Sequence, residues 1–245
     1  MGKGNLYKVE IYRFFHSFLI FICMVVSFCA ILILASGNSD ALLGDGTLLG
    51  GVESAMKIAN LIIVFVVSVV ISVYVGREFK QKTINYEIMS GHHLCKIGFT
   101  KTVTCGIFVS VLLLCGILLF FMTVPGVLQR YTFLHIVLMF LIVLHICSCT
   151  TLYAMLCRNG ALGGCLAFVR FTLLEVVVLF AAKLCVSTDI YNKCRTLAIM
   201  SQWSVAVNTD IVIPQGYLTG IVMGTVAEYV LLLGIIRLRS GKMDF

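Results

Sequence analysis

The chain has 245 residues, of which 60% are hydrophobic and 12% charged, and its mean hydropathy is +1.07. Soluble domains carry about 25% charged residues, so this composition excludes an ordinary soluble protein and indicates that the membrane is the solvent of the chain. The net charge is +7, and its meaning depends on where the basic residues lie.

The first predicted element is an amphipathic helix before the first apolar run. In the stretch LYKVEIYRFF, Tyr7, Ile11, Phe14 and Phe15 recur at the spacing of one helical face, whereas the basic side chains lie elsewhere around the helix. Such a helix can lie in the headgroup layer of a membrane. It can equally continue the first span into the cytoplasm, and the residues alone leave both arrangements open.

Runs of about 17–25 apolar residues predict membrane-spanning helices. Six such runs occur, so we expect an all-α integral membrane protein with a single six-span domain over residues 1–245 and no room for a separate soluble catalytic domain. The predicted spans are Ser17–Ala35, Ile58–Val75, Val103–Val124, Phe133–Leu156, Ala161–Val186 and Tyr217–Ile236.

Basic residues in the connections predict the orientation. With both termini in the cytoplasm, twelve of them lie inside and five outside, which follows the positive-inside rule. We therefore expect a multi-pass protein of the cell membrane with both termini cytoplasmic, and we see no indication of a nucleic-acid partner. The inside set is Lys3, Lys8, Arg13, Arg77, Lys80, Lys82, Lys96, Lys101, Arg158, Arg237, Arg239 and Lys242, and the outside set is Lys57, Arg130, Lys183, Lys193 and Arg195.

A basic, mostly polar segment, residues 76–101, separates the second and third spans. We expect a cytoplasmic loop that contains a short helix. Thr83 can cap its beginning, Ile84 and Ile88 share one face, and Gly91 can end it. A partner protein outside the membrane can bind such a short helix and move it.

The last outer loop, residues 187–216, contains an apolar patch around Leu197–Met200 and Trp203. Tryptophan is favoured at the membrane interface, so we expect part of this loop to dip back into the interface. Cys185 and Cys194 flank the beginning of the loop and could pair, although cysteine spacing by itself does not establish a disulfide.

Three ionisable residues lie deep within predicted spans, namely Arg170, Glu175 and Glu228. Such residues are costly in a bilayer and are usually paired or line a polar cavity. At 1.5 Å per residue, Arg170 and Glu228 both fall near the midplane and could meet. Glu175 lies about 140° from Arg170 around an α-helix and is the poorer partner.

The sixth span carries a row of small residues, Gly216, Gly220 and Gly224, which Glu228 extends. Rows of this kind let helices approach closely, so we expect this face to turn toward protein. Glu228 is then either a carboxylate of a substrate path or gate, or one half of a pair with Arg170 that fastens the fifth and sixth spans. We favour the fastening pair because ion pairs often serve packing.

The sequence contains no enzyme motif that we can identify. A zinc-binding His-Glu-x-x-His helix, a Gly-x-Ser-x-Gly elbow and a Walker A loop are all absent. His92 and His93 are adjacent in the loop, and His135 and His145 fall on different helix faces, so they do not form a ligand set. We therefore expect a non-catalytic chain without a metal or cofactor of its own.

The segment 76–101 resembles the loop after the second span in permease subunits of ABC-2 type exporters. That family has Glu-Phe-x-x-Gly-Thr-Ile, then a glycine, a Ser-Arg pair and a lysine at the next span. Lys82 stands in place of the first glycine, and His93-Leu94 in place of the Ser-Arg pair. The start LYKVEIYRFF and the end IRLRSGKMDF are also similar to the family. The matching residues are Glu78, Phe79, Thr83, Ile84, Gly91 and Lys101.

The resemblance implies a permease subunit that dimerises with a second copy or a related chain and is driven by a separate ABC ATPase subunit, where ATP binds. The loop would be the coupling helix, and short helices after the fifth span would close the outer end of the path. Small permeases of this type often belong to bacterial systems that export antimicrobial peptides, lipids or drug-like compounds. The implied coupling residues are Glu78, Phe79, Thr83, Ile84, Ile88 and Gly91.

Two other functions stay open at this point. One is a stand-alone membrane protein that binds and sequesters a toxin or lipid, such as an immunity protein. The other is an ion-coupled carrier that uses Glu175 and Glu228, although we find no internal repeat of the kind that such carriers often have.

Overall fold

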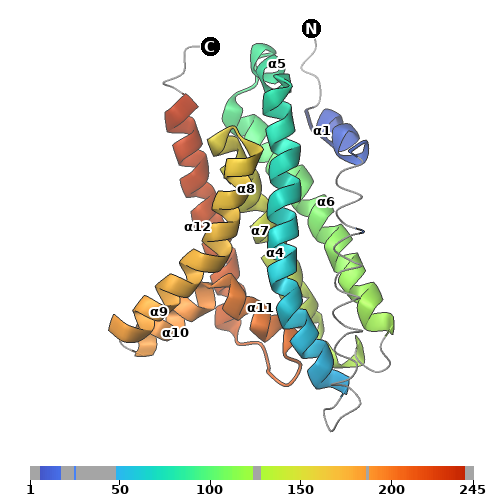
Figure 1. Cartoon of the computed structure of the whole chain (residues 1–245), viewed down its shortest axis with the longest axis vertical. Coiled ribbons are helices and arrows are strands. Elements are labelled where there is room, and N and C mark those ends of the chain that lie inside the picture. Colours follow the sequence, from blue (N-terminus) through green and yellow to red (C-terminus); the bar gives the residue numbers. More distant parts are fainter. Residues whose placement is uncertain (1–5, 18–24, 26–47, 124–127, 186–187, 241–245) are drawn as a thin grey trace.

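All regular structure is helical in the computed structural model, which describes residues 6–17, 25, 48–123, 128–185 and 188–240 (Figure 1). Backbone N–H and C=O groups have no water to bond within a bilayer, and a helix satisfies them within the segment itself. The predicted all-α architecture is confirmed for this part of the chain.

Five helical segments in the described residues are long and apolar enough to cross a membrane. They correspond to the predicted spans two to six, whereas the predicted first span, Ser17–Ala35, lies almost entirely outside the described residues. The segments are α4 (Leu48–Lys80), α6 (Leu94–Thr123), α7 (Phe133–Cys157), the continuous run of α8 (Gly160–Val169), η2 (Arg170–Leu174) and α9 (Glu175–Cys185), and α12 (Gln215–Ser240).

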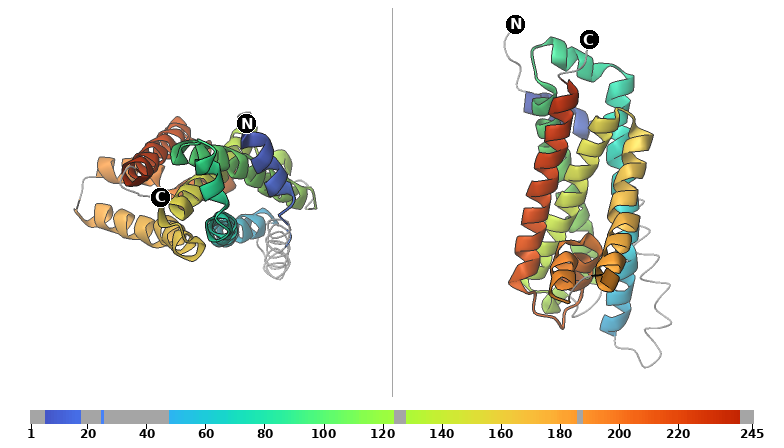
Figure 2. Two further views of the ribbon diagram at one scale, coloured as in Figure 1. Left: turned by 90° about the horizontal axis from the view of Figure 1, so that it is seen from above. Right: turned by 90° about the vertical axis from the view of Figure 1, so that its left-hand side faces the viewer.

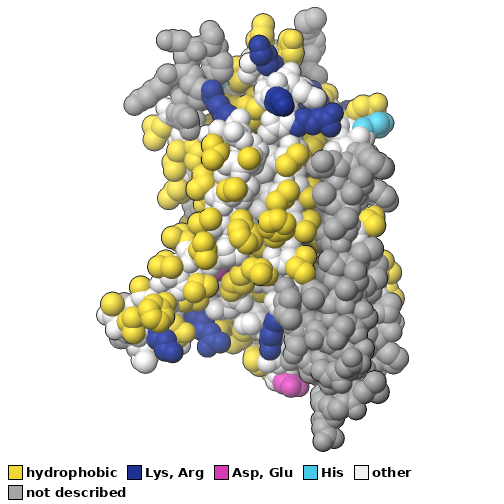
Figure 3. All heavy atoms as spheres, in the orientation of Figure 1, with side chains coloured by type: hydrophobic (Ala, Val, Ile, Leu, Met, Phe, Trp, Pro, Cys, Tyr) yellow, Lys and Arg dark blue, Asp and Glu magenta, His cyan; other side chains and the backbone are white. Residues whose placement is uncertain are grey.

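Helix α7 is the centre of the bundle, with α4, α6, α8 and α12 packed around it (Figure 2). Its Leu138, Met139, Ile142 and Ile146 are all fully buried. A helix that is apolar on all sides has no amphipathic stripe and must be surrounded by protein or lipid. The outer helices turn many apolar side chains outward, as the hydrophobic flank of the molecule makes plain (Figure 3).

Small residues let α4 and α8 cross in backbone contact. A Cβ atom on Gly76 would lie 2.4 Å from the Gly160 nitrogen, and one on Gly160 would lie 2.4 Å from the Ser72 carbonyl oxygen. Gly164 faces Ser68 and Ser72 in the same way. The positions repeat every four residues on each helix, which is the small-xxx-small arrangement of close helix pairs in membranes.

The fourth described segment, which corresponds to the fifth predicted span, bends where its α-helical geometry is interrupted. Residues Arg170–Leu174 form a single turn of π-helix between α8 and α9, and such a turn is a recognised cause of helix kinks. Below it, α9 leans away from the bundle together with α10 (Thr188–Leu197) (Figure 1).

The predicted outer loop is largely helical. After α10, helix α11 (Ile199–Val207) packs against α7 and α4. Trp203 is buried, and its indole nitrogen donates a hydrogen bond to the Met56 carbonyl oxygen at 2.8 Å. Ala198, Ile199 and Trp203 of the apolar patch are therefore buried against protein, whereas Leu197 is exposed. The burial of Trp203 replaces the expectation that it lies at the lipid interface.

Candidate functional site

A short helix stands at one end of the bundle, where α1 (Leu6–Phe15) and the last turn of α12 also lie (Figure 1). This helix, α5, covers Thr83–Met89. It ends as the sequence predicts, with Gly91 in the left-handed region at φ 89°. The Gly91 nitrogen bonds to the Ile88 carbonyl and the His92 nitrogen to the Glu87 carbonyl, which is the Schellman arrangement.

The beginning of α5 differs from the prediction. Thr83 is the first helical residue, and the preceding Lys82 is the N-cap, with φ 58° and no side-chain cap hydrogen bond. Thr83 therefore does not cap the helix. Glycine is the residue that most easily adopts a positive φ, so Lys82 holds a backbone conformation that would suit glycine better.

The polar segment is also shorter than expected. Helix α4 continues to Lys80 and α6 already begins at Leu94, so only residues 81–93 connect the two helices. Ile84 is buried and Ile88 half-buried, and Phe79 is half-buried against the same core. The predicted apolar face of α5 thus packs on the bundle.

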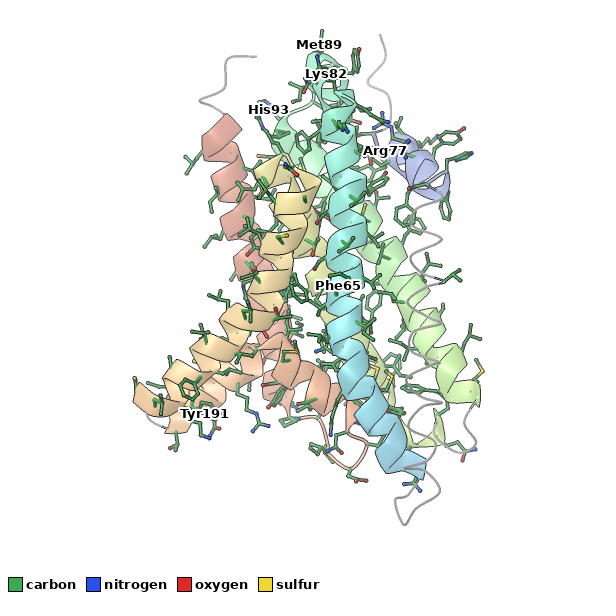
Figure 4. All side chains as sticks on the ribbon, viewed as in Figure 1. Phe65, Arg77, Lys82, Met89, His93 and Tyr191 are labelled. Carbon is green, nitrogen blue, oxygen red and sulfur yellow. The ribbon has the colours of Figure 1, made fainter. Side chains whose placement is uncertain are left out.

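The outward face of α5 carries side chains that the bundle does not cover. Tyr86 is 68% exposed and Met89 81% exposed. Met89 and Lys82 both project from this end of the molecule (Figure 4). The described part of the chain therefore leaves these two large side chains of α5 largely uncovered.

Five charged residues from four helices meet beneath α5, and we call them the α5-end charge network: Glu10 and Arg13 of α1, Glu78 of α4, Glu87 of α5, and Lys101 of α6. The Lys101 ammonium is fully buried, lies 2.6 Å from Glu10 Oε1 and also pairs with Glu78. Arg13 pairs with Glu87 and lies 3.2 Å from Glu10 Oε1.

Helix α1 is folded so that its charges enter this network. Glu10 and Phe14 are buried, whereas Tyr12 and Phe15 point outward, and the helix ends at Phe15 before a turn at His16. Burial lowers the pKa of Arg13, but the hydrogen bond to Glu87 and the surrounding carboxylates more than offset this and raise its pKa overall. Helix α1 packs against α6 near the α5 end of the bundle (Figure 2).

A second set of polar residues lies in the middle of the bundle, and we call it the midspan network. Arg170 Nη2 lies 3.0 Å from Glu228 Oε2, so the structure brings together the two residues that were expected to meet. The Tyr153 hydroxyl donates a hydrogen bond to Glu228 Oε1 at 2.9 Å. Arg170 is about 15 Å along its span from Gly160, half of a typical hydrocarbon thickness.

Glu175 is a partner of Arg170, contrary to the expectation from α-helical geometry. Arg170 Nη1 lies 3.2 Å from Glu175 Oε1, and Glu175 Oε2 also accepts a hydrogen bond from the Met200 amide. The π-turn between them explains the difference, because its i→i+5 bonding brings residues five apart closer to one face. The bend therefore places two carboxylates on one guanidinium.

His145 joins the midspan network although no motif singled it out. Its Nδ1 lies 2.7 Å from the Thr225 hydroxyl and its Nε2 3.6 Å from Glu228 Oε2. With Cys149 and Glu228 it forms a group whose ligand atoms lie within 4.8 Å of one another. We assign no metal to this group, because Arg170 already supplies the positive charge beside Glu228 and a second cation there would be repelled.

The glycine row of α12 faces protein, as expected. A Cβ atom on Gly220 would lie 2.7 Å from the Thr196 carbonyl oxygen, and Gly216 and Gly224 also face the end of α10. The neighbour is thus the helix after the bent span, and the sequence did not identify it. Cys185 and Cys194 are both free thiols.

Sequence reasoning missed the roles of Glu10, Arg13 and Glu87. Two signals were available: Glu10 stands between Leu6 and Phe14 on one helical face, and Glu87 interrupts the apolar side of a short helix. Buried carboxylates need a cation, yet nothing in the sequence indicates which of the basic residues supplies it.

Comparison with known proteins does not identify a family. No protein-family model matches the chain, and no curated protein or solved structure matches it either. The structure establishes a multi-pass helical membrane protein with five candidate spans in the described residues.

Proposed function

We propose that this protein is the membrane-spanning permease subunit of an ABC exporter, which forms a translocation path as a dimer and is driven by a separate ATPase subunit. The observation that carries the proposal is α5, a defined short helix between two candidate spans with Tyr86 and Met89 exposed. Its resemblance to the ABC-2 type coupling loop supports the same function.

In the proposed mechanism, the α5-end charge network transmits movement of α5 to α1, α4 and α6. Glu87 ties α5 to Arg13 of α1, and Lys101 of α6 binds both Glu10 of α1 and Glu78 of α4. Breaking one member of a buried ion pair is costly, so a push on α5 moves these helices together instead of detaching it. In this mechanism, closure of the ATPase tilts α4 and α6 and switches the access of the path.

The midspan network has a supporting role in this mechanism. Arg170 holds Glu175 and Glu228 at once and therefore ties the bent span to α12. We propose that this pair fastens the helices that move as a unit. The cargo is a peptide, a lipid or a drug-like compound, and both termini lie in the cytoplasm in this assignment.

Photo-crosslinking from α5 in living cells tests the proposal. Met89 is replaced by a photoreactive phenylalanine, and the adducts are identified by mass spectrometry. We expect a covalent adduct with a protein that contains Walker A and Walker B motifs. The matched control is the same substitution at Val212, which is 88% exposed and lies between α11 and α12.

The alternatives predict other outcomes. An immunity or other binding protein would give no ATPase adduct at Met89 and would retain its protective effect in cells depleted of ATP. An ion-coupled carrier would continue transport without ATP and would lose it in Glu228→Gln. Either result would replace the exporter assignment.

A further inference from the structure

A cavity lies beside α5, between the end of α4 and the beginning of α8. It has a volume of about 730 Å³. Four basic residues, Arg77, Lys80, Lys82 and Arg158, line it, and none of its described lining residues is Asp or Glu. A concave site of one charge sign concentrates the opposite charge.

Three of these cations, Arg77, Lys80 and Lys82, are not part of the two charge networks described above. Arg77, Lys80 and Lys82 make no ion pair within the part of the chain that the structure describes. Glu78, the acidic neighbour of Arg77, is buried against Lys101. These three side chains therefore bring to the cavity positive charge that no ion pair within the described residues neutralises.

Two residues that line the cavity have an unfavourable backbone conformation. Lys82 at φ 58° and Arg158 at φ 54° are the two non-glycine residues with positive φ in the described chain, and both line the cavity. Such conformations are unfavourable for residues with a Cβ and concentrate at functional sites. Here each one turns the chain at the end of a span while it keeps a cation at the cavity wall.

The beginning of α8 adds polar groups suited to an anion. Asn159 caps α8 by accepting a hydrogen bond from the Ala161 nitrogen at 3.0 Å, and Gly160 and Ala161 line the cavity. The partial positive charge of a helix N-terminus favours phosphate and other anions. The 10-residue α8 thus contributes to the same field as the four side chains.

The cavity also has an apolar side at the level of the spans. Val73 and Phe79 line it, and further along α4 and α8 the exposed side chains are apolar, including Val69, Leu162 and Leu166. Figure 3 shows basic side chains gathered near one end of this face, with hydrophobic side chains below them. A soluble anion would need only the basic surface, whereas a lipid needs both the basic surface for its headgroup and the apolar surface for its acyl chains.

We propose that this cavity binds the phosphate headgroup of an anionic phospholipid from the leaflet at the α5 end, with its acyl chains along α4 and α8. Basic pockets between membrane helices are suited to such headgroups. The site lies beside Gly76 and Gly160, where α4 and α8 touch, so a bound lipid bridges the two helices next to α5. The inference does not depend on the exporter function.

Lipid binding to the delipidated full-length protein in detergent tests the site, measured by native mass spectrometry with cardiolipin, phosphatidylglycerol and phosphatidylcholine. The test variant is Arg77→Gln with Lys82→Asn, since asparagine tolerates a positive φ. The matched control is Lys8→Gln with Lys96→Gln, which removes two charges from exposed positions that do not line the cavity. We expect the anionic lipids to bind at least tenfold more weakly to the test variant only.

Each other outcome overturns the proposal. Equal weakening in the control variant would show general charge attraction, and unchanged binding in the test variant would place the lipid elsewhere. If phosphatidylcholine bound as tightly as the anionic lipids, the site would not select lipids by headgroup charge. Full competition by millimolar inorganic phosphate would make the cavity a site for a soluble anion, and loss of ATPase binding with unchanged lipid binding would make it a protein-docking surface.

Discussion

Arg170 lies 3.0 Å from Glu228 across two spans and 3.2 Å from Glu175 on its own span. One guanidinium therefore serves two carboxylates near the middle of the membrane thickness, and the π-turn between Arg170 and Glu175 makes this possible. The consequence is a fixed junction between the bent span and α12.

The first prediction concerns this junction. Arg170→Met alone should lower the stability in detergent by roughly 3–5 kcal/mol, because it leaves Glu175 and Glu228 without their cation. Glu228→Gln alone should cost less, because Arg170 keeps Glu175 as its partner. The double variant should recover the part of the Arg170→Met loss that comes from Glu228, because only Glu175 then lacks its cation. Melting temperatures of the four forms measure this, and strictly additive losses would show that the pair does not fasten the helices.

The second prediction concerns Lys101. Its side chain is fully buried, so Lys101→Met should remove the buried cation that Glu10 and Glu78 share, leave them only Arg13, and destabilise the protein by about 3–5 kcal/mol. Lys96→Met, at an exposed position on the same helix, should change stability by less than about 0.5 kcal/mol. Hydrogen exchange of α1 should accelerate only in the Lys101 variant. Equal behaviour of the two variants would contradict the network.

The third prediction concerns the crossing of α4 and α8. Gly160→Ala would place a Cβ atom 2.4 Å from the Ser72 carbonyl oxygen, and the forced separation should cost about 1–3 kcal/mol. Gly234→Ala meets no atom within 4 Å and should instead be neutral or stabilising, by up to about 1 kcal/mol. Thermal unfolding of the two variants decides whether this contact is as close as described.

The fourth prediction concerns the end of α5. Gly91 has φ 89° with open space around it, so Gly91→Val should disturb the Schellman turn through backbone strain alone. Gly91→Asn, which tolerates a positive φ, should be close to normal. We expect ATPase association and transport to fall in the first variant, with membrane insertion unchanged in both. Normal coupling in Gly91→Val would mean that α5 is only a connector.

The fifth prediction concerns orientation. Asn85 of α5 and Asn192 of α10 are both exposed, and Figure 1 places their helices at opposite ends of the bundle. In a background without native cysteines, Asn192→Cys should react with an impermeant reagent added to intact cells, and Asn85→Cys should react only after permeabilisation. The reverse pattern would invert the membrane topology and reject the cytoplasmic coupling role.

Features that depend on neighbouring residues in the chain could be read from the sequence. Spans two to six follow from the length of their apolar runs, because a bilayer requires about 20 such residues. The end of α5 follows from Gly91, because a left-handed residue closes a helix and glycine adopts it most easily. The midplane depth of Arg170 and Glu228 follows from the constant rise of a helix.

Features that depend on contacts through space were decided only by the tertiary structure. Lys101 was expected at the mouth of a span, yet it is buried because Glu10 and Glu78 converge on it from α1 and α4. The contact between Arg170 and Glu175 required a π-turn that no residue pattern announces. The basic cavity likewise exists because α4 and α8 cross at glycines, which brings Lys82 and Arg158 to one wall although they are far apart in the chain.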